Sequence, residues 1–248
     1  MKCSDVQRWF LQRRLPVVDL ASSEWAHAAA ETGVRPGVWQ EKCLRRMCDA
    51  GMLRRIRRGL YVVVDPSREA PAAAIASAAN VQRPHYVTTD AALSIHGLID
   101  QPVPTITVIT TDRGLRPFNL GATNIRFTLT SPSRFVKADH YETTVDGFRI
   151  DLASRSQAVL DVLDQPDRMV HSSLLPEVLQ AFDDEESAGL ALAALGNSKA
   201  AAQRLGYLLE EARAPIPAPL ELFAPTSSVR LWPGRSSAAY SSRWRVYG

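Results

Sequence analysis

The fold is decided by residues 33–64, which read GVRPGVWQEKCLRRMCDAGMLRRIRRGLYVVV. A short turn at the start of this stretch leads into a helix predicted from about Gly37 to Ala50, which Gly51 ends. Residues 52–64 then begin as a strand, turn near Arg57–Gly59 and continue as a β-branched second strand. The stretch therefore predicts a helix followed by a β-hairpin, and the hairpin carries four arginines within five residues.

Two more helices are predicted upstream of this stretch. The apolar spacing in Val6–Leu15 is that of a short amphipathic helix, which ends before Pro16. A second helix is predicted from about Ser23 to Glu31, with Ser22 or Ser23 as its N-cap and Gly33 as its stop. Helix, helix, glycine-containing turn, helix and basic hairpin is the order of a winged helix-turn-helix.

The charge is divided unevenly along the chain. The net charge of +3 is made of 13 Lys and Arg against 7 Asp and Glu in residues 1–68, and of 16 against 19 in residues 69–248. An N-terminal excess of this kind indicates that one part of the chain meets a polyanion and the other does not. Arginine outnumbers lysine 25 to 4 in the whole chain, so the signal is the clustering and not the choice of arginine.

The helix of residues 37–50 presents two different faces. Leu44, Met47 and Cys48, with Gln40 one turn earlier, are predicted to face the core. The opposite face is predicted to enter the major groove and contact base edges, while the hairpin lies along phosphates or in a minor groove. The predicted DNA-binding residues are Arg35, Trp39, Lys42, Arg45, Arg46, Arg54, Arg55, Arg57 and Arg58.

Other interpretations of these residues stay open at this point. Trp39 is compatible with packing between domains as well as with DNA contact, and a run such as Arg54–Arg58 is often only a solvated surface turn. Asp49 is predicted to point outward and to repel phosphate, so we expect the end of its helix to leave the groove.

The pattern changes to mixed α and β beyond about Ser67, after which a Pro-punctuated link leads into an Ala-rich helix. Thr88, Thr89 and Asp90 are the candidate N-caps of a short helix. The further predicted strands are 105–110, 124–130, 148–152, 229–231 and 244–247, and the further helices are 154–163, 174–182, 188–195 and 199–212. The predicted fold class is α+β or mixed α/β, with a winged helix-turn-helix at 1–67 and a larger mixed α/β domain at 68–248.

The motifs of several enzyme classes are missing from the sequence. It has no GxxxxGK[ST] phosphate loop, no GxSxG elbow, no HExxH and no histidine pair at i, i+4. After residue 68 the only lysines are Lys137 and Lys199, and neither completes the E-x-K element of a restriction-type nuclease. Cys3, Cys43 and Cys48 lack metal-ligand spacing. We therefore expect no enzyme, no catalytic residue, no metal and no cofactor.

The apolar runs and the N-terminal residues predict the cellular compartment. No apolar run approaches the roughly 20 residues that cross a bilayer, and the N-terminal MKCSDVQR has no apolar stretch behind its Lys. We expect a cytoplasmic protein without a membrane partner.

Several stretches, in order, resemble one known family. The first is Leu44-x-x-Met47-x-x-x-Gly51-x-Leu53-x-x-Ile56-x-x-Gly59-x-Tyr61, and the second is YVTTDAAL followed by HGL, Gln101, Ile106 and Val108 over residues 86–108. The third is FRIDLAS at 148–154, followed by Ala158 to Pro166. The fourth and most specific is RLGYLLE at 204–210, and the last is Trp244. Together they span about Val17 to Tyr247 and resemble the AbiEi family of antitoxins, the regulator half of a bicistronic toxin–antitoxin (abortive-infection) system. Gln40 departs from the family, which often has an apolar residue at this position. The difference bears on which residues of the helix face the core, and therefore on the DNA-binding role predicted for Trp39.

The resemblance implies a two-domain protein whose N-terminal winged helix binds repeats in its own promoter, as double-stranded DNA, and represses transcription. It implies that the C-terminal domain counters a nucleotidyltransferase-like toxin encoded next door. In the family this antagonism is described as not requiring a stable complex, so direct binding of the toxin is not assumed.

Two alternatives of other classes stay open. One is a ligand- or protein-responsive winged-helix transcription regulator without a toxin, which the downstream gene would distinguish. The other is an enzyme such as a nuclease with a DNA-targeting module, which metal-dependent cleavage would reveal. For the family-like pieces of the second domain we expect structural roles: Gly97 as a helix C-cap, Arg204 in a buried ion pair and Gly206 in close helix packing.

Overall fold

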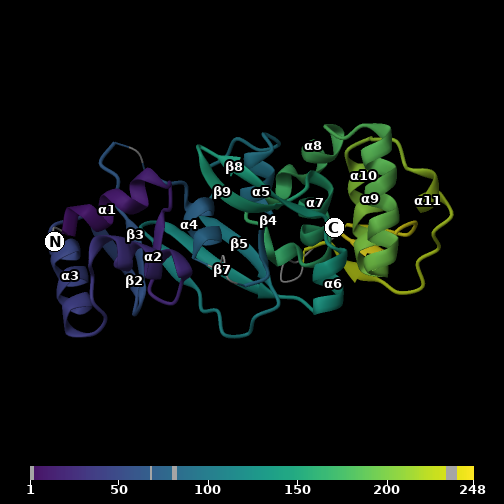
Figure 1. Ribbon diagram of the computed structural model, residues 1–248. Helices are drawn as coiled ribbons and strands as arrows, with labels where there is room; N and C mark the ends of the chain where they lie inside the picture. The colour runs from purple at the N-terminus through teal and green to yellow at the C-terminus, as the bar shows by residue number, and fades with distance from the viewer. Residues whose placement is uncertain (1–2, 68, 80–82, 233–238) are drawn as a thin grey trace. The chain divides into compact units, whose positions relative to one another are not determined.

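The computed structural model describes residues 3–67, 69–79, 83–232 and 239–248, and in them the chain is a mixed α/β protein, as predicted (Figure 1). It divides into two compact units. Unit 1 comprises Met1–Val87, Val108–Phe135 and Glu142–Leu152, and unit 2 comprises Thr88–Thr107, Val136–Tyr141 and Ala153–Gly248. The predicted domain boundary after residue 67 stays a prediction, and Arg68 lies outside the described residues.

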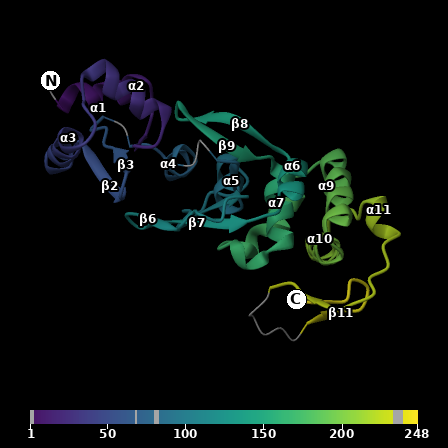
Figure 2. The same cartoon turned by 60° about the horizontal axis from the view of Figure 1, so that its bottom comes forward.

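The N-terminal part of unit 1 consists of three helices and a small antiparallel sheet. Its elements are α1 (Cys3–Gln12), β1 (Val17–Asp19), α2 (Ser23–Thr32), α3 (Val38–Asp49), β2 (Leu53–Arg57) and β3 (Leu60–Val63). The strand order is β1-β3-β2, so β3 is central and β2 is an outer strand. Figure 2 shows the three helices grouped around β2 and β3.

Local signals fix where α2 ends and where the chain turns. The Ser22 hydroxyl accepts a hydrogen bond from the Trp25 backbone N–H at 3.1 Å, which caps the helix as predicted. At the other end Gly33 adopts φ 71°, and the N–H of Val34 reaches back to the Ala29 carbonyl at 2.8 Å. Because the side chain of Val34 is also buried, this turn holds the start of α3 in a fixed direction.

The core of this part takes side chains from all six of its elements or their flanks. Phe10 and Met47 are fully buried, and the cluster also contains Val6, Trp9, Val18, Trp25, Ala28, Val34, Cys43, Leu44, Leu53, Tyr61 and Val63. Two polar contacts fasten α1 to its neighbours: the Trp9 Nε1 donates to Glu31 at 2.8 Å, and the Gln7 amide donates to the Val64 carbonyl at 2.7 Å. The helices are therefore held by both apolar packing and long-range hydrogen bonds.

The second, larger sheet has six strands in the order β6-β7-β5-β4-β9-β8. Its strands are β4 (His85–Thr88), β5 (Thr105–Thr110), β6 (Phe118–Leu120), β7 (Thr123–Leu129), β8 (His140–Val145) and β9 (Phe148–Ala153). Strands β4 and β9 pair in parallel and β6 pairs with β7 antiparallel, so the sheet is mixed. Val87, Val108 and Ile150 are fully buried on it.

The helices outside the N-terminal part are α4 (Ala72–Ala78), α5 (Asp90–Ile95), α6 (Pro132–Lys137), α7 (Arg155–Asp164), α8 (Leu175–Gln180), α9 (Asp184–Asn197), α10 (Lys199–Glu211) and α11 (Ala218–Glu221). In unit 2, α7, α9 and α10 pack against one another, and Figure 1 shows α9 beside α10. A small sheet of β10 (Val229–Arg230), β12 (Val246–Tyr247) and β11 (Tyr240–Ser241) follows, and β12 and β10 lie against α10.

Two predicted boundaries were wrong for backbone reasons, and one predicted N-cap has the right position without a cap bond. The first helix ends at Gln12 rather than Leu15, because Arg14 adopts a left-handed φ of 53° and its N–H bonds back to Leu11. The last strand starts at Val246, because Arg245 also has a left-handed φ of 54°. Thr89 is the N-cap of α5 but makes no cap bond, and the carboxylate of Asp90 instead accepts the backbone N–H groups of 170 and 171.

Candidate nucleic-acid interface

The direction of α3 is set by its buried face. Cys43, Leu44 and Met47 are buried against the core, and Gln40 and Cys48 are half-buried at its borders. The buried face of α3 is therefore rotated slightly from the predicted face of Leu44, Met47 and Cys48: Cys43 is buried, whereas Cys48 is only half-buried. The solvent-facing side is the one that carries the predicted DNA-binding residues.

The outer face of α3 is basic and partly apolar. Lys42, Arg45 and Arg46 are exposed, and Trp39 is 63% exposed. The Lys42 Nζ lies 5.6 Å from the centroid of the Trp39 ring, a cation–π distance. Val38, beside Trp39, is 64% exposed and was not among the predicted residues. The sequence signal for it was its position, as the residue before Trp39 at the start of the helix.

The cations of α3 differ in their partners. The Arg45 Nε lies 4.0 Å from an Asp49 carboxylate oxygen one turn further along, and both side chains are well exposed. Asp49 therefore lies on the outer face, as predicted, and balances part of the Arg45 charge. Exposed pairs of this kind contribute little to stability, but they lower the net positive charge near that end of the helix.

Arg35 is exposed in the turn that leads into α3. It lies between Gly33 and Gly37, both with positive φ, at 71° and 85°. Gly37 is the N-cap of α3, and no side chain caps the helix there. A helix start without an N-cap side chain can receive an anionic oxygen.

The remaining four predicted residues lie on β2 and the turn after it. Arg54, Arg55 and Arg58 are exposed, and Arg57 is half-buried. A bulge between Arg55 and Arg57 interrupts the pairing of β2 with β3. Such bulges increase the local twist of a strand and change the direction of its side chains. The turn itself is fastened by the Leu20 N–H, which donates to the Gly59 carbonyl at 2.9 Å.

The strand β2 packs against α3. Burial and the nearby Asp49 carboxylate raise the pKa of the Cys48 thiol, while the Arg55 guanidinium opposes that shift. Within the described part of the chain, Arg45 is the one member of the predicted set with an ion pair. For the seven other cations of that set, the described residues supply no carboxylate partner, and α3, β2 and the turns before α3 and after β2 carry them.

The predicted structural roles in unit 2 have different outcomes. Gly97 follows the C-cap of α5 with φ 72°, as predicted, and a side chain at Gly206 would collide with the Trp244 ring. Arg204, 8% exposed, donates to the carbonyls of Leu163 and Arg230 at 2.7 and 2.9 Å. Burial lowers its pKa, and the Asp164 and Asp167 carboxylates oppose that shift. Carbonyl oxygens are thus its direct partners where an ion pair was predicted.

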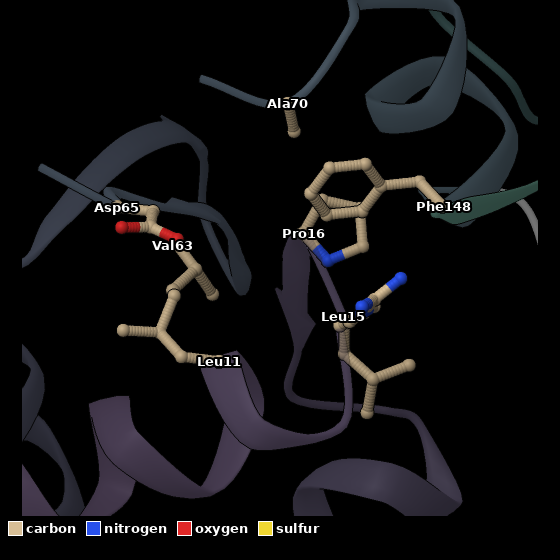
Figure 3. Close-up of a pocket in the computed structure, with 8 residues that line it drawn as sticks. Leu11, Leu15, Pro16, Val63, Asp65, Ala70 and Phe148 are labelled. Carbon is tan, nitrogen blue, oxygen red and sulfur yellow. The ribbon is translucent and has the colours of Figure 1, made fainter. Parts of the chain in front are cut away.

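Within unit 1 a pocket lies beside α1. Figure 3 shows Phe148 close to Pro16, with Leu15 and Ala70 nearby, and the wall is completed by Leu11, Arg14, Val63 and Asp65. The lining is mainly apolar, with one guanidinium and one carboxylate. It is a place where a small amphipathic molecule could be held.

Neither a metal-binding cluster nor a membrane-spanning helix occurs among the described residues. In that part of the chain, no three or more His, Cys, Asp or Glu side chains are grouped to hold a metal ion. None of the helices described has both the length and the apolar character needed to cross a membrane.

The chain is similar in fold to a protein of known structure. No protein-family model and no curated protein sequence matches it. Among solved structures, it is similar to the crystal structure of the RV2827C protein from Mycobacterium tuberculosis, with a TM-score of 0.65 and 15% sequence identity. The match covers 98% of this chain and 90% of that one. At this identity the likeness concerns the fold, which the two chains share over nearly their whole length.

Proposed function

We propose that the chain is a DNA-binding transcriptional autorepressor and the antitoxin of an AbiEi-like toxin–antitoxin operon, without catalysis of its own. The observation that carries the DNA-binding half is the group of uncompensated cations on α3, on β2 and in the turns beside them, on an exposed surface of unit 1. Duplex DNA presents closely spaced phosphates, and releasing their counterions is a strong driving force for such a surface.

The proposal includes a winged helix-turn-helix built from α1, β1, α2, α3, β2 and β3. In it, α3 is the recognition helix and the β2–β3 hairpin is the wing. The element order, the tight turn at Gly33 and the pairing of β1 with β3 support this arrangement. Arg46 and Lys42 would then approach base edges from α3, while Arg54, Arg55, Arg57 and Arg58 would contact phosphates.

The antitoxin half rests on the resemblance of the second domain to the AbiEi family. Its most specific piece, RLGYLLE, lies on α10, where Arg204 and Gly206 are both engaged in packing. We propose that this domain counters a nucleotidyltransferase-like toxin encoded beside the gene in the cytoplasm, and direct binding of the toxin is not part of the proposal.

The first experiment is fluorescence anisotropy of the purified full chain on the DNA upstream of its own gene and on a scrambled duplex, at several salt concentrations. We expect tight, sequence-dependent binding that weakens steeply with salt. Equal weak binding to both duplexes would leave only nonspecific attraction and would refute the repressor half.

The antitoxin half is tested by co-expressing the chain with the product of the neighbouring gene. We expect the wild-type chain to restore growth. An Arg57→Ala, Arg58→Ala variant should lose repression of a promoter reporter but still restore growth, because the two activities are placed in different domains. A wild-type chain that fails to restore growth would refute the antitoxin half and leave the DNA-binding result standing.

The pocket beside α1 favours a second candidate, a ligand-responsive regulator not linked to a toxin. Its lining includes Val63 at the end of β3, so a bound molecule would press on the strand that pairs with β2. A small molecule that changes the Kd for the upstream duplex in the wild type, but not in a Phe148→Ala variant, would support this candidate.

A further inference from the structure

We infer, on the basis of the proposed DNA-binding function, that Val38 and Trp39 recognise the C5-methyl groups of thymines in the major groove. The two residues open α3 and are the only two consecutive members of the set of large, exposed hydrophobic side chains in the described part of the chain. Both expose more than three fifths of their surface, at 64% and 63%. A single exposed apolar residue needs no explanation, but an adjacent pair forms a patch.

The charges around this pair identify its occupant. Lys42 follows Val38 by one turn, with its ammonium 5.6 Å from the Trp39 ring centroid, and Arg46 follows Trp39 by two turns on the same side. The nearest acidic residue of the helix, Glu41, lies one turn from Val38 on the side away from Trp39, and the exposed cations Lys42, Arg45 and Arg46 outnumber it on this face. An apolar partner protein would leave the cations unpaired. A DNA groove supplies both phosphates for the cations and an apolar group for the pair.

The thymine methyl is the apolar group that base edges present in the major groove. Access to it is helped by the backbone before the pair. Gly37 is the N-cap and has no side chain, and nothing lies within 4 Å of the place where its Cβ would be. At Gly37 itself, therefore, no side chain stands between the first turn of α3 and the base edges.

The test removes the methyl groups and leaves base pairing intact. The duplex from upstream of the gene is prepared with thymine and with deoxyuridine at the same positions. Each is titrated by anisotropy with the wild type and with a Val38→Ala, Trp39→Ala variant. For the wild type we expect the removal of each contacted methyl to weaken binding by about fourfold, the value of one buried methylene-sized group. For the double variant we expect the two duplexes to bind alike.

A Val136→Ala variant is the matched control, because Val136 is 83% exposed on α6. It should keep the wild-type preference for thymine. Circular dichroism checks that all variants fold, and the single variants Val38→Ala and Trp39→Ala show which side chain carries the effect. Each single variant should lose part of the preference.

The outcomes separate this inference from the function on which it rests. Sequence-specific binding with an equal thymine-to-uridine ratio in wild type and double variant would overturn the methyl contact alone. Binding that does not distinguish the upstream duplex from a scrambled one would overturn both the contact and the proposed function. A thymine preference that disappears only in the Val38 and Trp39 variants would establish the contact.

Discussion

The six-membered ring of the Trp244 indole lies against Gly206 in α10, in the space that a Cβ on this residue would occupy. The same ring donates its Nε1 hydrogen to Glu210 at 3.0 Å, and the Gln203 amide holds the Trp244 carbonyl at 2.9 Å. Gln203, Gly206 and Glu210 on one helix thus all contact Trp244. Gly206 has an ordinary helical backbone conformation that any residue can adopt, so it is the close approach of the Trp244 ring that requires a glycine here.

Substitution of this glycine should destabilise unit 2. For Gly206→Ala we expect a decrease of about 1–3 kcal/mol in the free energy of unfolding, since the added methyl must displace a buried ring. Gly189→Ala in α9 is the control, because nothing lies within 4 Å of its Cβ position, and it should raise stability by up to about 1 kcal/mol. Urea unfolding followed by circular dichroism measures both. Equal effects of the two substitutions would show that the ring moves away at little energetic expense.

Removal of the Arg57 and Arg58 side chains together should weaken binding to every DNA sequence by a similar factor. If both bind phosphates, the slope of log K against log salt should become shallower by about 1 for each arginine removed. A Lys137→Ala, Lys199→Ala variant removes the same charge from exposed sites of unit 2 and should keep the wild-type slope. An unchanged slope in the arginine double variant would mean that the hairpin is not at the phosphates.

Arg46 and Arg45 should behave differently although they are adjacent on α3 and both exposed. Arg46→Ala should alter which sequence is preferred, at about 1–3 kcal/mol of discrimination if it contacts a base. Arg45→Ala should instead weaken binding to all sequences by a similar factor, because it leaves the exposed Asp49 carboxylate uncompensated near the phosphates. A binding selection on randomised duplexes with each variant gives the comparison. Identical sequence preferences for both variants and the wild type would contradict a base contact by Arg46.

Cys48 should react slowly with alkylating agents near neutral pH. Burial and Asp49 raise its thiol pKa, so less of the reactive thiolate is present than in a free cysteine. Asp49→Asn removes a raising influence and should speed alkylation, whereas Arg55→Ala removes the lowering one and should slow it. Mass spectrometry of iodoacetamide-treated protein, read at the Cys48 peptide, measures the rates. Rates that change in the same direction in both variants would rule out this electrostatic account.

Features with local causes were predicted from the sequence. The ends of α2 follow from Ser22 and Gly33, and the outer face of α3 follows from helical periodicity, which placed Lys42 and Arg46 away from the core. The predicted strand over Thr105–Thr110 has the observed bounds because its β-branched pattern is uninterrupted. In each case a few neighbouring residues contain all the information that the backbone needs.

Features that depend on distant partners were not predicted. The strand β1 has three residues, too few for an alternating pattern, and exists because β3 pairs with it. Asp90 was predicted as a cap, but N–H groups some 80 residues away occupy its carboxylate. The exposure of Val38 likewise depends on the phase of α3, which the packing of Cys43 sets. Which cations have a carboxylate partner also depends on the fold. The exceptions are pairs at i, i+4 spacing on one helix, such as Arg45 and Asp49.

Because β2 is an outer strand of its sheet, its arginines have a second effect. An outer strand presents unpaired backbone N–H and C=O groups to which a strand of another molecule can add. The bulge between Arg55 and Arg57 and the charges on either side make that addition unfavourable. The arginines proposed to bind phosphates would therefore also oppose the pairing of identical chains through β2. Replacing Arg54, Arg55 and Arg57 with apolar side chains is expected to weaken the proposed attraction to DNA and to favour self-association through the outer strand.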